Sequence, residues 1–322
     1  MGVMRYRKLG RTGLEISDIG YGAWGIGGKQ WKGGTDDESV RALQRAFECG
    51  LNFIDTALAY GDGHSEKLVG AVVKQAPHKV FVATKVPPMN RIWPAAPGSN
   101  LDDVFPYEYI VRSTEESLRN LEVETIDLQQ LHVWDPGWLD RDEWKRAFED
   151  LKRQGKIRFT GVSINDHQPD SALGVVRSGL IDSVQVIYNI FDQTPESNLF
   201  PETQKNNVGV IARVPFDEGS LTGAITEDST FEGDEFRAFY FKGDRKKQVM
   251  HHVSQLRADI EGSLPEIALR FCLSHPAVSS VIPGMRRVKN VESNCRVSDA
   301  GPLEEAGLQK LRKHAWNKNF YS

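Results

Sequence analysis

The sequence predicts an α/β protein whose strands close into a (β/α)8 TIM barrel, with an N-terminal β-hairpin and long loops on the catalytic face. The main observation is an alternation of eight short β-favouring runs with eight helical segments. Parallel strands joined by right-handed helical crossovers close most readily into a barrel. A chain of 322 residues without a linker or an internal repeat fits one such barrel. We therefore expect one domain over residues 1–322.

The N-terminal part is expected to form a hairpin and then the first strand and helix of the barrel. Residues 5–17 carry two extended patches around a turn at Gly10–Gly13, and this hairpin would cap the bottom of the barrel. The first barrel strand is expected at residues 19–24, and the glycines that follow indicate an exposed loop. Thr35 or Asp36 can cap the next helix. Its apolar side chains are Val40, Leu43, Ala46 and Phe47.

The rest of the chain repeats this pattern. Strands are expected at residues 52–55, 80–86, 126–132, 159–163, 183–188, 208–215 and 278–283. Helices are expected at residues 65–74, 107–121, 140–154, 169–178, 195–206, 264–275 and 288–296. Two connections, residues 87–106 and 216–248, are unusually long, and loops of this length in a compact domain are usually functional. Because both follow barrel strands, we expect them on the catalytic face.

The composition restricts the class of partner. A hydrophobic fraction of 39% is enough for a barrel core, and a net charge of −4 argues against a nucleic-acid or anionic-membrane surface. Cys49, Cys272 and Cys295 are widely spaced and lack CxxC pairing, which indicates a reducing compartment. No apolar run approaches 18 residues and no apolar core follows the N-terminus. We expect a cytoplasmic protein without a membrane span, acting on small molecules.

Four reactive residues stand at or near the ends of predicted strands: Asp55, Tyr60, Lys85 and His132. Barrel enzymes keep their chemistry at the carboxyl ends of their strands. A lysine ammonium favours a phenolate and lowers the pKa of a nearby tyrosine, so that Tyr60 can act as a general acid. Asp55 would hold Lys85, and His132 would orient a carbonyl oxygen or supply protons to Tyr60. One such residue alone is usually structural, but four together indicate proton transfer to a carbonyl oxygen while hydride reaches its carbon.

This set resembles the catalytic residues of the aldo-keto reductase superfamily. The resemblance rests on segment 53–61, with Thr84-Lys85 and Leu131-His132 at the family spacing, and it extends over nearly the whole chain. It implies an NADP-dependent oxidoreductase of CH–OH donors, which uses NADPH without a Rossmann fold and reduces an aldehyde or ketone to an alcohol reversibly. In this comparison Tyr60 is the general acid, Lys85 and Asp55 tune it, and His132 orients the substrate.

The resemblance also implies a cofactor site. Gly161-Val162-Ser163 is similar to the family's GVSN signature, although Ile164 separates Ser163 from Asn165. Segment 282–287 resembles the family's segment for the adenosine 2′-phosphate, and two arginines before a helix also suit a phosphate on physical grounds. This favours NADP over NAD. The implied cofactor residues are Gly22, Ala23, Trp24, Asp55, Ser163, Asn165, Gln185, Arg213, Pro215, Gly219, Leu221, Gly223, Gly284, Arg286, Arg287, Asn290 and Asn294.

Arg213 departs from the family pattern. Relatives usually read Tyr-Ser-Pro-Leu after the seventh strand, with the aromatic ring stacked on nicotinamide, whereas this chain reads Arg213-Val214-Pro215-Phe216. A guanidinium can stack through its planar face, but its charge should disfavour NADP+ relative to NADPH. Reduction would then be the preferred direction. Alternatively, Arg213 points to an acidic substrate group or forms an ion pair with Asp217 or Glu218.

The two long loops are assigned to the walls of the site. Residues 87–106, with Met89, Trp93 and Phe105, would line the substrate pocket, and Trp24 and Trp134 could line it too. Residues from Gly219 onward would form a lid over the cofactor pyrophosphate. The alternative is that these aromatic side chains only pack the loops onto the barrel. The loop residues are compatible with aromatic aldehydes, sugars or other polyols.

Two other functions are conceivable for a barrel of this kind. The same fold serves as an NADPH-binding regulatory or redox-sensing subunit in the family's potassium-channel β-subunits, but the intact catalytic set argues against this reading. A metal-dependent or Schiff-base lyase would require convergent ligands, or a Lys85 free of Asp55, and the sequence shows neither. The remaining histidines show no metal-ligand spacing, and there is no nucleophile elbow or phosphate-binding GxxxxGK[ST] motif. We expect no metal.

Overall fold

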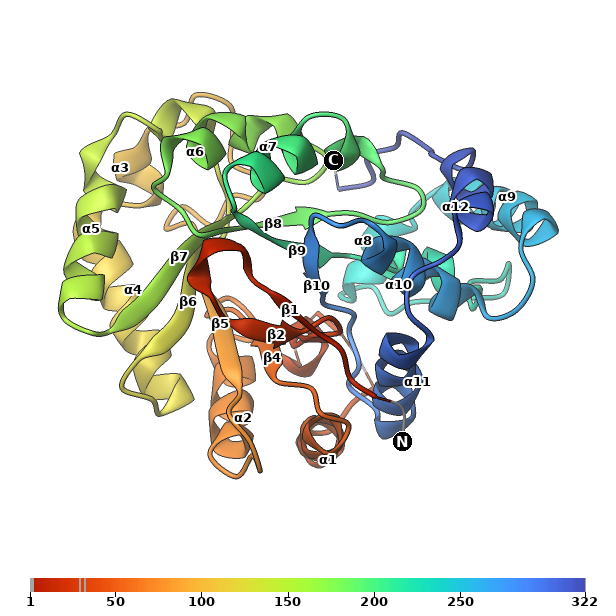
Figure 1. The fold of residues 1–322 in the computed structure, drawn as a ribbon, viewed down its shortest axis with the longest axis horizontal. Coiled ribbons are helices and arrows are strands. Elements are labelled where there is room, and N and C mark those ends of the chain that lie inside the picture. Colours follow the sequence, from red (N-terminus) through yellow and green to blue (C-terminus); the bar gives the residue numbers. More distant parts are fainter. Residues whose placement is uncertain (1–2, 29, 32, 322) are drawn as a thin grey trace.

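The computed structural model describes residues 3–28, 30–31 and 33–321, and it shows a parallel sheet curled into a barrel (Figure 1). Its strands are β3 (Tyr21–Gly22), β4 (Phe53–Asp55), β5 (Phe81–Val86), β6 (Ile126–Leu131), β7 (Ile157–Ser163), β8 (Ser183–Ile187), β9 (Gly209–Arg213) and β10 (Val278–Val281). Neighbours in sequence are neighbours in the sheet, from β3 to β10. Parallel bridges from Ile19 to Val281 and from Gly22 to Gly284 join the two edge strands. The predicted (β/α)8 barrel is therefore confirmed.

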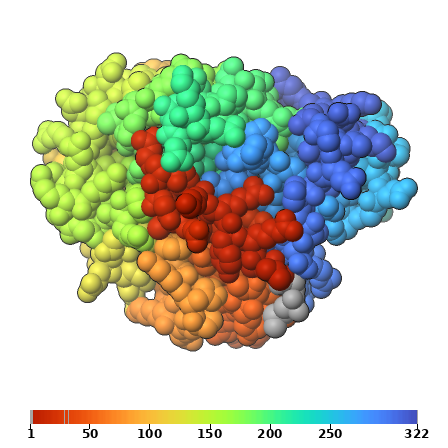
Figure 2. Space-filling view, viewed as in Figure 1, coloured from red at the N-terminus to blue at the C-terminus, as the bar shows by residue number. Residues whose placement is uncertain are grey.

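A hairpin seals the amino ends of the barrel strands, as predicted. Strand β1 (Tyr6–Lys8) pairs antiparallel with β2 (Glu15–Ser17). In Figure 2 this N-terminal part, in red, crosses the middle of the face. The hairpin side chains Leu9, Leu14 and Ile16 are buried and form a separate apolar cluster with residues from the barrel interior. Gly10 has a φ of +47°, and a Cβ there would lie 2.2 Å from the backbone nitrogen of Gly209, so the hairpin requires glycine at this contact.

The barrel helices are α1 (Asp36–Glu48), α2 (His64–Val73), α4 (Tyr107–Leu121), α5 (Asp142–Arg153), α6 (Leu173–Ser178), α7 (Leu199–Lys205), α10 (Leu264–Ser274) and α11 (Val288–Ala300). The Thr35 side chain accepts a hydrogen bond from the Glu38 amide at the start of α1, as predicted. Two predicted helices differ at their starts. The 3-10 turns η4 (Pro169–Ala172) and η5 (Thr194–Glu196) precede α6 and α7. Proline has no N–H and suits a tight first turn.

The long connections contain helices that the sequence pattern did not reveal. The first holds α3 (Leu101–Val104), and the second holds η6 (Asp217–Thr222), α8 (Phe236–Tyr240) and the start of α9 (Arg245–Asp259). The buried side chains of α9 are Val249, Val253 and Leu256, among many charged neighbours, so its apolar periodicity is weak. The remaining elements are η1 (Gly10–Thr12), η2 (Trp24–Ile26), η3 (Pro136–Trp138) and α12 (Glu305–Arg312). Among the described residues, none of the helices is both long and apolar enough to span a membrane.

Candidate active site

A cavity of about 900 Å³ lies at the carboxyl ends of the barrel strands. Its size suits a small-molecule or cofactor site. Asp55, Tyr60 and His132 line it, and so do residues of both long connections. Lys85 lies below its floor, fully buried. Three of the four predicted catalytic side chains therefore face one cavity, and the fourth contacts two of them from beneath.

Lys85 connects Asp55 and Tyr60. Its Nζ donates hydrogen bonds to Asp55 Oδ1 at 2.5 Å, to the Thr56 carbonyl oxygen at 2.8 Å and to the Tyr60 hydroxyl at 3.4 Å. The other Asp55 oxygen accepts from the side-chain amides of Gln185 at 2.8 Å and Gln130 at 3.2 Å. Both charges are thus paired and hydrogen-bonded, which a buried ion pair requires.

The strand geometry explains why Asp55 and Lys85 meet. In the parallel ladder Asp55 pairs with Ala83, two residues before Lys85, so Asp55 and Lys85 side chains share the inner face. Thr84, between Ala83 and Lys85, points the other way and donates to Glu66 of α2 at 2.6 Å. One strand thus supplies both a barrel-interior cation and an outer contact with a helix.

The Tyr60 hydroxyl is kept protonated. Burial raises the pKa of Tyr60, and the Lys85 ammonium opposes this shift without reversing it. The expectation that Lys85 would bring the pKa below its ordinary value is therefore corrected, because desolvation is the larger effect. Burial alone would lower the pKa of Lys85, but Asp55 and Tyr60 raise it overall, so Lys85 remains an ammonium. A neutral hydroxyl beside an ammonium is the form that donates a proton.

His132 is held neutral beside Tyr60. Burial, followed by the nearby charges of Lys85 and Arg213, lowers the pKa of His132 well below its ordinary value. Its ring centroid lies 5.7 Å from that of Tyr60. Its Nδ1 is buried and has no hydrogen-bond partner among the described residues. A neutral imidazole carries one N–H donor and one acceptor, so it can orient a carbonyl oxygen without adding charge.

Aromatic side chains form the walls around Tyr60 and His132. The Trp24 ring stacks on Tyr60 at 6.2 Å, and the Trp93 ring meets His132 edge-on at 5.8 Å. Trp24 and Trp93 both line the cavity. These rings give the cavity an aromatic lining beside Tyr60 and His132.

Three other pocket assignments are wrong. Trp134 is fully buried and packs against Trp138 at 6.0 Å and Trp144 at 5.4 Å, outside the cavity lining. Phe105 is also fully buried, and its ring lies 5.6 Å from Trp138. Met89 is 40% exposed and does not line the cavity. Trp134 and Phe105 pack loops onto the barrel, which is the alternative that the sequence analysis gave for these aromatic side chains.

Arg213 lines the cavity and forms an ion pair with Asp166, which is not one of the partners predicted from the sequence. Its Nη2 donates to Asp166 Oδ1 at 2.6 Å and to the Ile164 carbonyl oxygen at 3.0 Å. The expected ion pairs with Asp217 or Glu218 are absent from the described structure, because Lys318 and Tyr321 bond these two carboxylates. Burial disfavours the charge, but Asp166 more than compensates and raises the pKa of Arg213. The side chain remains a guanidinium.

The residues expected around the nicotinamide carboxamide lie together. Ser163, Asn165 and Gln185 all line the cavity. The Asn165 side chain is committed to structure, since its Oδ1 accepts from the backbone amides of Ala95 at 3.3 Å and Trp134 at 3.4 Å. Asn165 therefore fastens the first long loop to the end of β7. Ser163 is the better candidate for contact with a ligand. Gln185 donates its amide N–H to Asp55 and could contact a ligand through its amide oxygen.

The opposite end of the cavity fits a phosphate group. Gly284, Arg286 and Asn290 line it at the start of α11. Arg286 Nη1 is buried without a hydrogen-bond partner in the described part of the chain. Burial and the neighbouring cations Arg287 and Arg237 lower the pKa of Arg286. A buried guanidinium N–H among like charges suits an anionic oxygen, so these residues fit the phosphate of a dinucleotide.

Four predicted cofactor residues do not line the cavity. Arg287 pairs with Glu38 of α1 at 3.7 Å. Asn294 is a buried residue of α11, and Leu221 packs in the core. Gly223 faces the Arg257 guanidinium, which a Cβ would approach to 2.1 Å. The residues that do line it are Gly22, Ala23, Trp24, Asp55, Ser163, Asn165, Gln185, Arg213, Pro215, Gly219, Gly284, Arg286 and Asn290.

Two loops meet over the cavity, and sequence reasoning missed most of the residues involved. The Trp24 ring lies 4.8 Å from that of Phe236, and the Phe236 amide donates to the Gln30 carbonyl oxygen at 3.1 Å. The Arg237 guanidinium lies over the Trp31 ring at 5.2 Å. Aromatic residues in an aperiodic loop were the only available signal. Other lining residues not predicted are Arg91, Asp166, Glu218, Phe231 and Tyr321.

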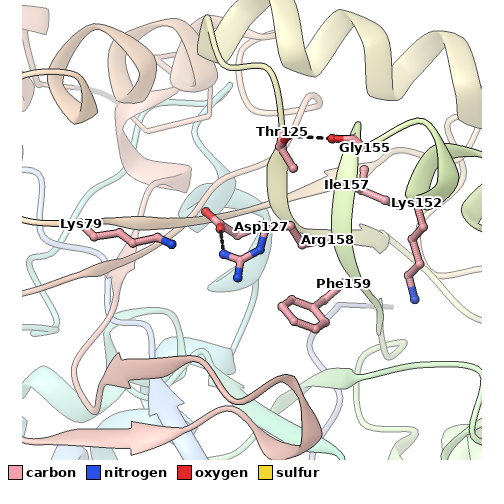
Figure 3. A pocket seen from close by; sticks show the side chains of 8 residues that line it. All are labelled: Lys79, Thr125, Asp127, Lys152, Gly155, Ile157, Arg158 and Phe159. Carbon is pink, nitrogen blue, oxygen red and sulfur yellow. Dashed lines mark hydrogen bonds and ion pairs between the residues drawn. The ribbon is translucent and has the colours of Figure 1, made fainter.

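A second hollow, of about 700 Å³, lies at the amino ends of β6 and β7, away from this site (Figure 3). Asp127 in its wall pairs with Arg158 at 2.7 Å, and Lys152 pairs with Asp182 at 3.3 Å. Lys79 lies over the Phe81 ring at 5.1 Å. These charges already have partners, and among the described residues no three metal-binding side chains gather anywhere. The catalytic-face cavity is therefore the candidate site.

The buried Asp55–Lys85 pair and the Tyr60 hydroxyl, at the carboxyl ends of the strands of a (β/α)8 barrel, form a site that can donate a proton to a bound substrate. A model of the Aldo/keto reductase family matches residues 18–315. The chain therefore belongs to the Aldo/keto reductase family.

Known proteins are similar over most of their length. "Aldo-keto reductase YhdN" of Bacillus subtilis is 32% identical over 303 residues, covering 90% of this chain and 87% of that protein. The "NADH-specific methylglyoxal reductase" of Escherichia coli is 29% identical, covering 97% and 98%. The holo form of aldo-keto reductase AKR11C1 from Bacillus halodurans superposes with a TM-score of 0.77 at 28% identity, covering 97% of each chain. The chain is thus an oxidoreductase of this family, and it is similar to these proteins over most of its barrel.

Proposed function

We propose that this protein is an NADPH-dependent reductase of aldehydes or ketones, and that it also catalyses the reverse oxidation of the alcohol. The observation that carries the proposal is the Lys85 ammonium, which lies 2.5 Å from Asp55 and 3.4 Å from the Tyr60 hydroxyl under a cavity of cofactor size. This arrangement can protonate a carbonyl oxygen and stabilise the phenolate that remains.

Each residue has a defined role in the proposed reaction. Tyr60 donates its proton to the carbonyl oxygen, and Lys85 stabilises the resulting phenolate. Asp55 keeps Lys85 charged, and neutral His132 orients the carbonyl oxygen through its ring N–H. The hydride for the carbonyl carbon would come from a reduced nicotinamide held in the same cavity by residues such as Ser163 and Gln185. Oxidation of an alcohol uses the same groups in reverse, with Tyr60 as the base.

The cofactor preference rests on the phosphate end of the cavity. Arg286, Gly284 and Asn290 would hold the adenosine phosphate, while Ser163 and Gln185 would hold the carboxamide. The unpartnered buried Nη1 of Arg286 supports NADPH over NADH, because the 2′-phosphate would supply the missing acceptor. A similar protein is named NADH-specific, so both cofactors need testing.

The first experiment is titration of the protein with NADPH and, in parallel, NADH, followed by quenching of tryptophan fluorescence. Trp24, Trp31 and Trp93 line the cavity and should report binding. The same sample is then given aromatic aldehydes, sugar aldehydes and ketones while the nicotinamide absorbance is recorded. Tighter binding of NADPH together with turnover supports the proposal. Binding without turnover favours a regulatory subunit of the same fold, and no binding contradicts both.

A further inference from the structure

The segment after α12, residues 313–321, returns to the candidate active site. Tyr321 lines the cavity, and its hydroxyl donates to Glu218 Oε1 at 2.6 Å. Three residues earlier, Lys318 donates to Asp217 Oδ2 at 2.6 Å, and both side chains are buried. The segment is therefore bonded at two adjacent carboxylates of η6, the turn expected to cover the cofactor.

Further contacts keep this segment in place. The Lys318 ammonium lies 4.2 Å from the Trp316 ring centroid and 4.5 Å from that of Phe320. The Phe320 carbonyl oxygen accepts from Arg245 of α9 at 2.6 Å. The Tyr321 ring packs on Tyr240 at 5.2 Å, Phe236 at 6.0 Å and His167 at 5.7 Å. A ring fixed on several sides is pre-organised as a binding surface.

Because position 213 holds an arginine, an aromatic ring next to the nicotinamide would have to come from another segment of the chain. The sequence comparison expects an aromatic side chain at position 213 against the nicotinamide, and this chain has none there. The Arg213 guanidinium is directed to Asp166 and to the Ile164 carbonyl oxygen. Tyr321 and Arg213 line the same cavity and are close enough to interact electrostatically. Arg286 and Asn290 are at the other, phosphate-binding end.

We propose that Tyr321 is a binding residue for the nicotinamide end of the cofactor and provides the aromatic surface that position 213 lacks. This inference rests on the proposed function, since it concerns the same cofactor. Glu218 acts as a positioning residue that fixes the Tyr321 ring. Lys318 and Asp217 hold the segment that carries it.

The test compares two ligands on matched variants. NADPH contains the nicotinamide ring, whereas 2′-phospho-ADP-ribose lacks it and keeps the phosphates. Tyr321→Leu removes the ring but fills its space, and Tyr321→Phe keeps the ring but removes the hydroxyl. The control is Phe239→Leu, because Phe239 lies in α8, the helix that the Tyr321 ring packs on, but is 42% exposed and does not line the cavity. Dissociation constants are measured by tryptophan quenching or calorimetry, with thermal unfolding as a check of folding.

Tyr321→Leu should raise the dissociation constant of NADPH about three- to tenfold, the loss expected for one aromatic contact. The same variant should bind 2′-phospho-ADP-ribose like the wild type. Tyr321→Phe keeps the ring but loses the contact with Glu218, so it should weaken NADPH binding less than Tyr321→Leu does. Phe239→Leu should bind both ligands nearly normally. Equal weakening of both ligands would overturn the inference, since Tyr321 would then act only through η6. Unchanged NADPH binding in Tyr321→Leu would also overturn it, whereas failure of the wild type to bind NADPH would reject the proposed function itself.

Discussion

Lys85 and Asp55 form an ion pair at 2.5 Å in which the side chains are 0% and 2% exposed. Burying two charges is costly, and it is compensated here by the amides of Gln130 and Gln185 and by the Thr56 carbonyl oxygen. The pair as a whole is neutral, but it fixes the Lys85 ammonium as the charged group nearest the Tyr60 hydroxyl, and it makes each partner depend on the other.

Lys85→Met should be both unstable and inactive. It leaves the Asp55 carboxylate buried without its counter-ion, which costs about 3–5 kcal/mol. The double variant Lys85→Met/Asp55→Asn should regain much of the free energy of unfolding but none of the turnover. Urea unfolding and carbonyl reduction are measured on the same preparations. A double variant no more stable than Lys85→Met would contradict the assignment of the pair.

Tyr60→Phe should separate binding from chemistry. The ring and its stacking on Trp24 remain, but the proton donor is lost. We expect NADPH binding close to that of the wild type and turnover lower by about two or more orders of magnitude. Fluorescence titration and steady-state kinetics check the two parts. Turnover near the wild-type rate would rule out the proposed role of Tyr60.

His132 should make the fold less stable in acid. Because the pKa of His132 is lowered in the folded protein, the unfolded chain binds more protons below pH 6.5. Stability is then full above pH 6.5 and falls as the pH drops towards the folded pKa. His132→Gln cannot take up this proton, so it should lose less stability between pH 7.5 and 5.5. Identical losses in wild type and variant would show that His132 is not buried as described.

Glu218 should make the fold less stable as the pH rises, which is the opposite of the effect of His132. Burial, partly opposed by the Tyr321 hydrogen bond, raises the pKa of Glu218 to about 7, with Asp217, Arg213 and Asp166 nearby. The folded state therefore binds the extra proton, and this stabilisation is complete below pH 4.5 and is lost as the pH rises through 7. The free energy of unfolding of Glu218→Gln, relative to that of the wild type, should be higher at pH 8 than at pH 5. This difference between the two pH values should be up to about 3 kcal/mol. Urea denaturation at both pH values measures this difference.

Arg213→Tyr should change the affinity of the protein for NADP+ relative to its affinity for NADPH. Removing a cation from beside an oxidised nicotinamide should strengthen NADP+ binding relative to NADPH by about threefold or more, even though Asp166 already offsets part of the charge. The control is Asp166→Asn, which leaves Arg213 uncompensated and should shift the ratio the other way. An unchanged ratio of the two dissociation constants in Arg213→Tyr would reject the idea.

The sequence predicted the barrel because local signals and global fold agree. Helix α4 begins and ends at the predicted residues, since Pro106 precedes a regular apolar repeat. Asp55 and His132 were placed correctly at the cavity because strand ends are visible as the point where a β-favouring run stops. Such information is contained in a few neighbouring residues.

Contacts between distant segments could not be predicted in this way. Asp166 is 47 positions from Arg213, and no periodicity connects them. Trp134 follows a strand end as Trp24 does, but Trp138 and Trp144 bury it, which depends on how η3 packs. Tyr321 reaches the cavity from beyond the last helix. Each case was decided by tertiary packing.

The hairpin that seals the amino ends of the barrel has an evolutionary consequence. Its cluster of Leu9, Leu14 and Ile16 with the strand interiors has no member in the cavity wall other than Ile282. One end of the barrel thus preserves the fold, and the other can accumulate changes in loops 87–106 and 216–248. Descendants of this chain could acquire new substrates by changes in those loops alone, while the hairpin-sealed end of the barrel and the proton donor stay the same.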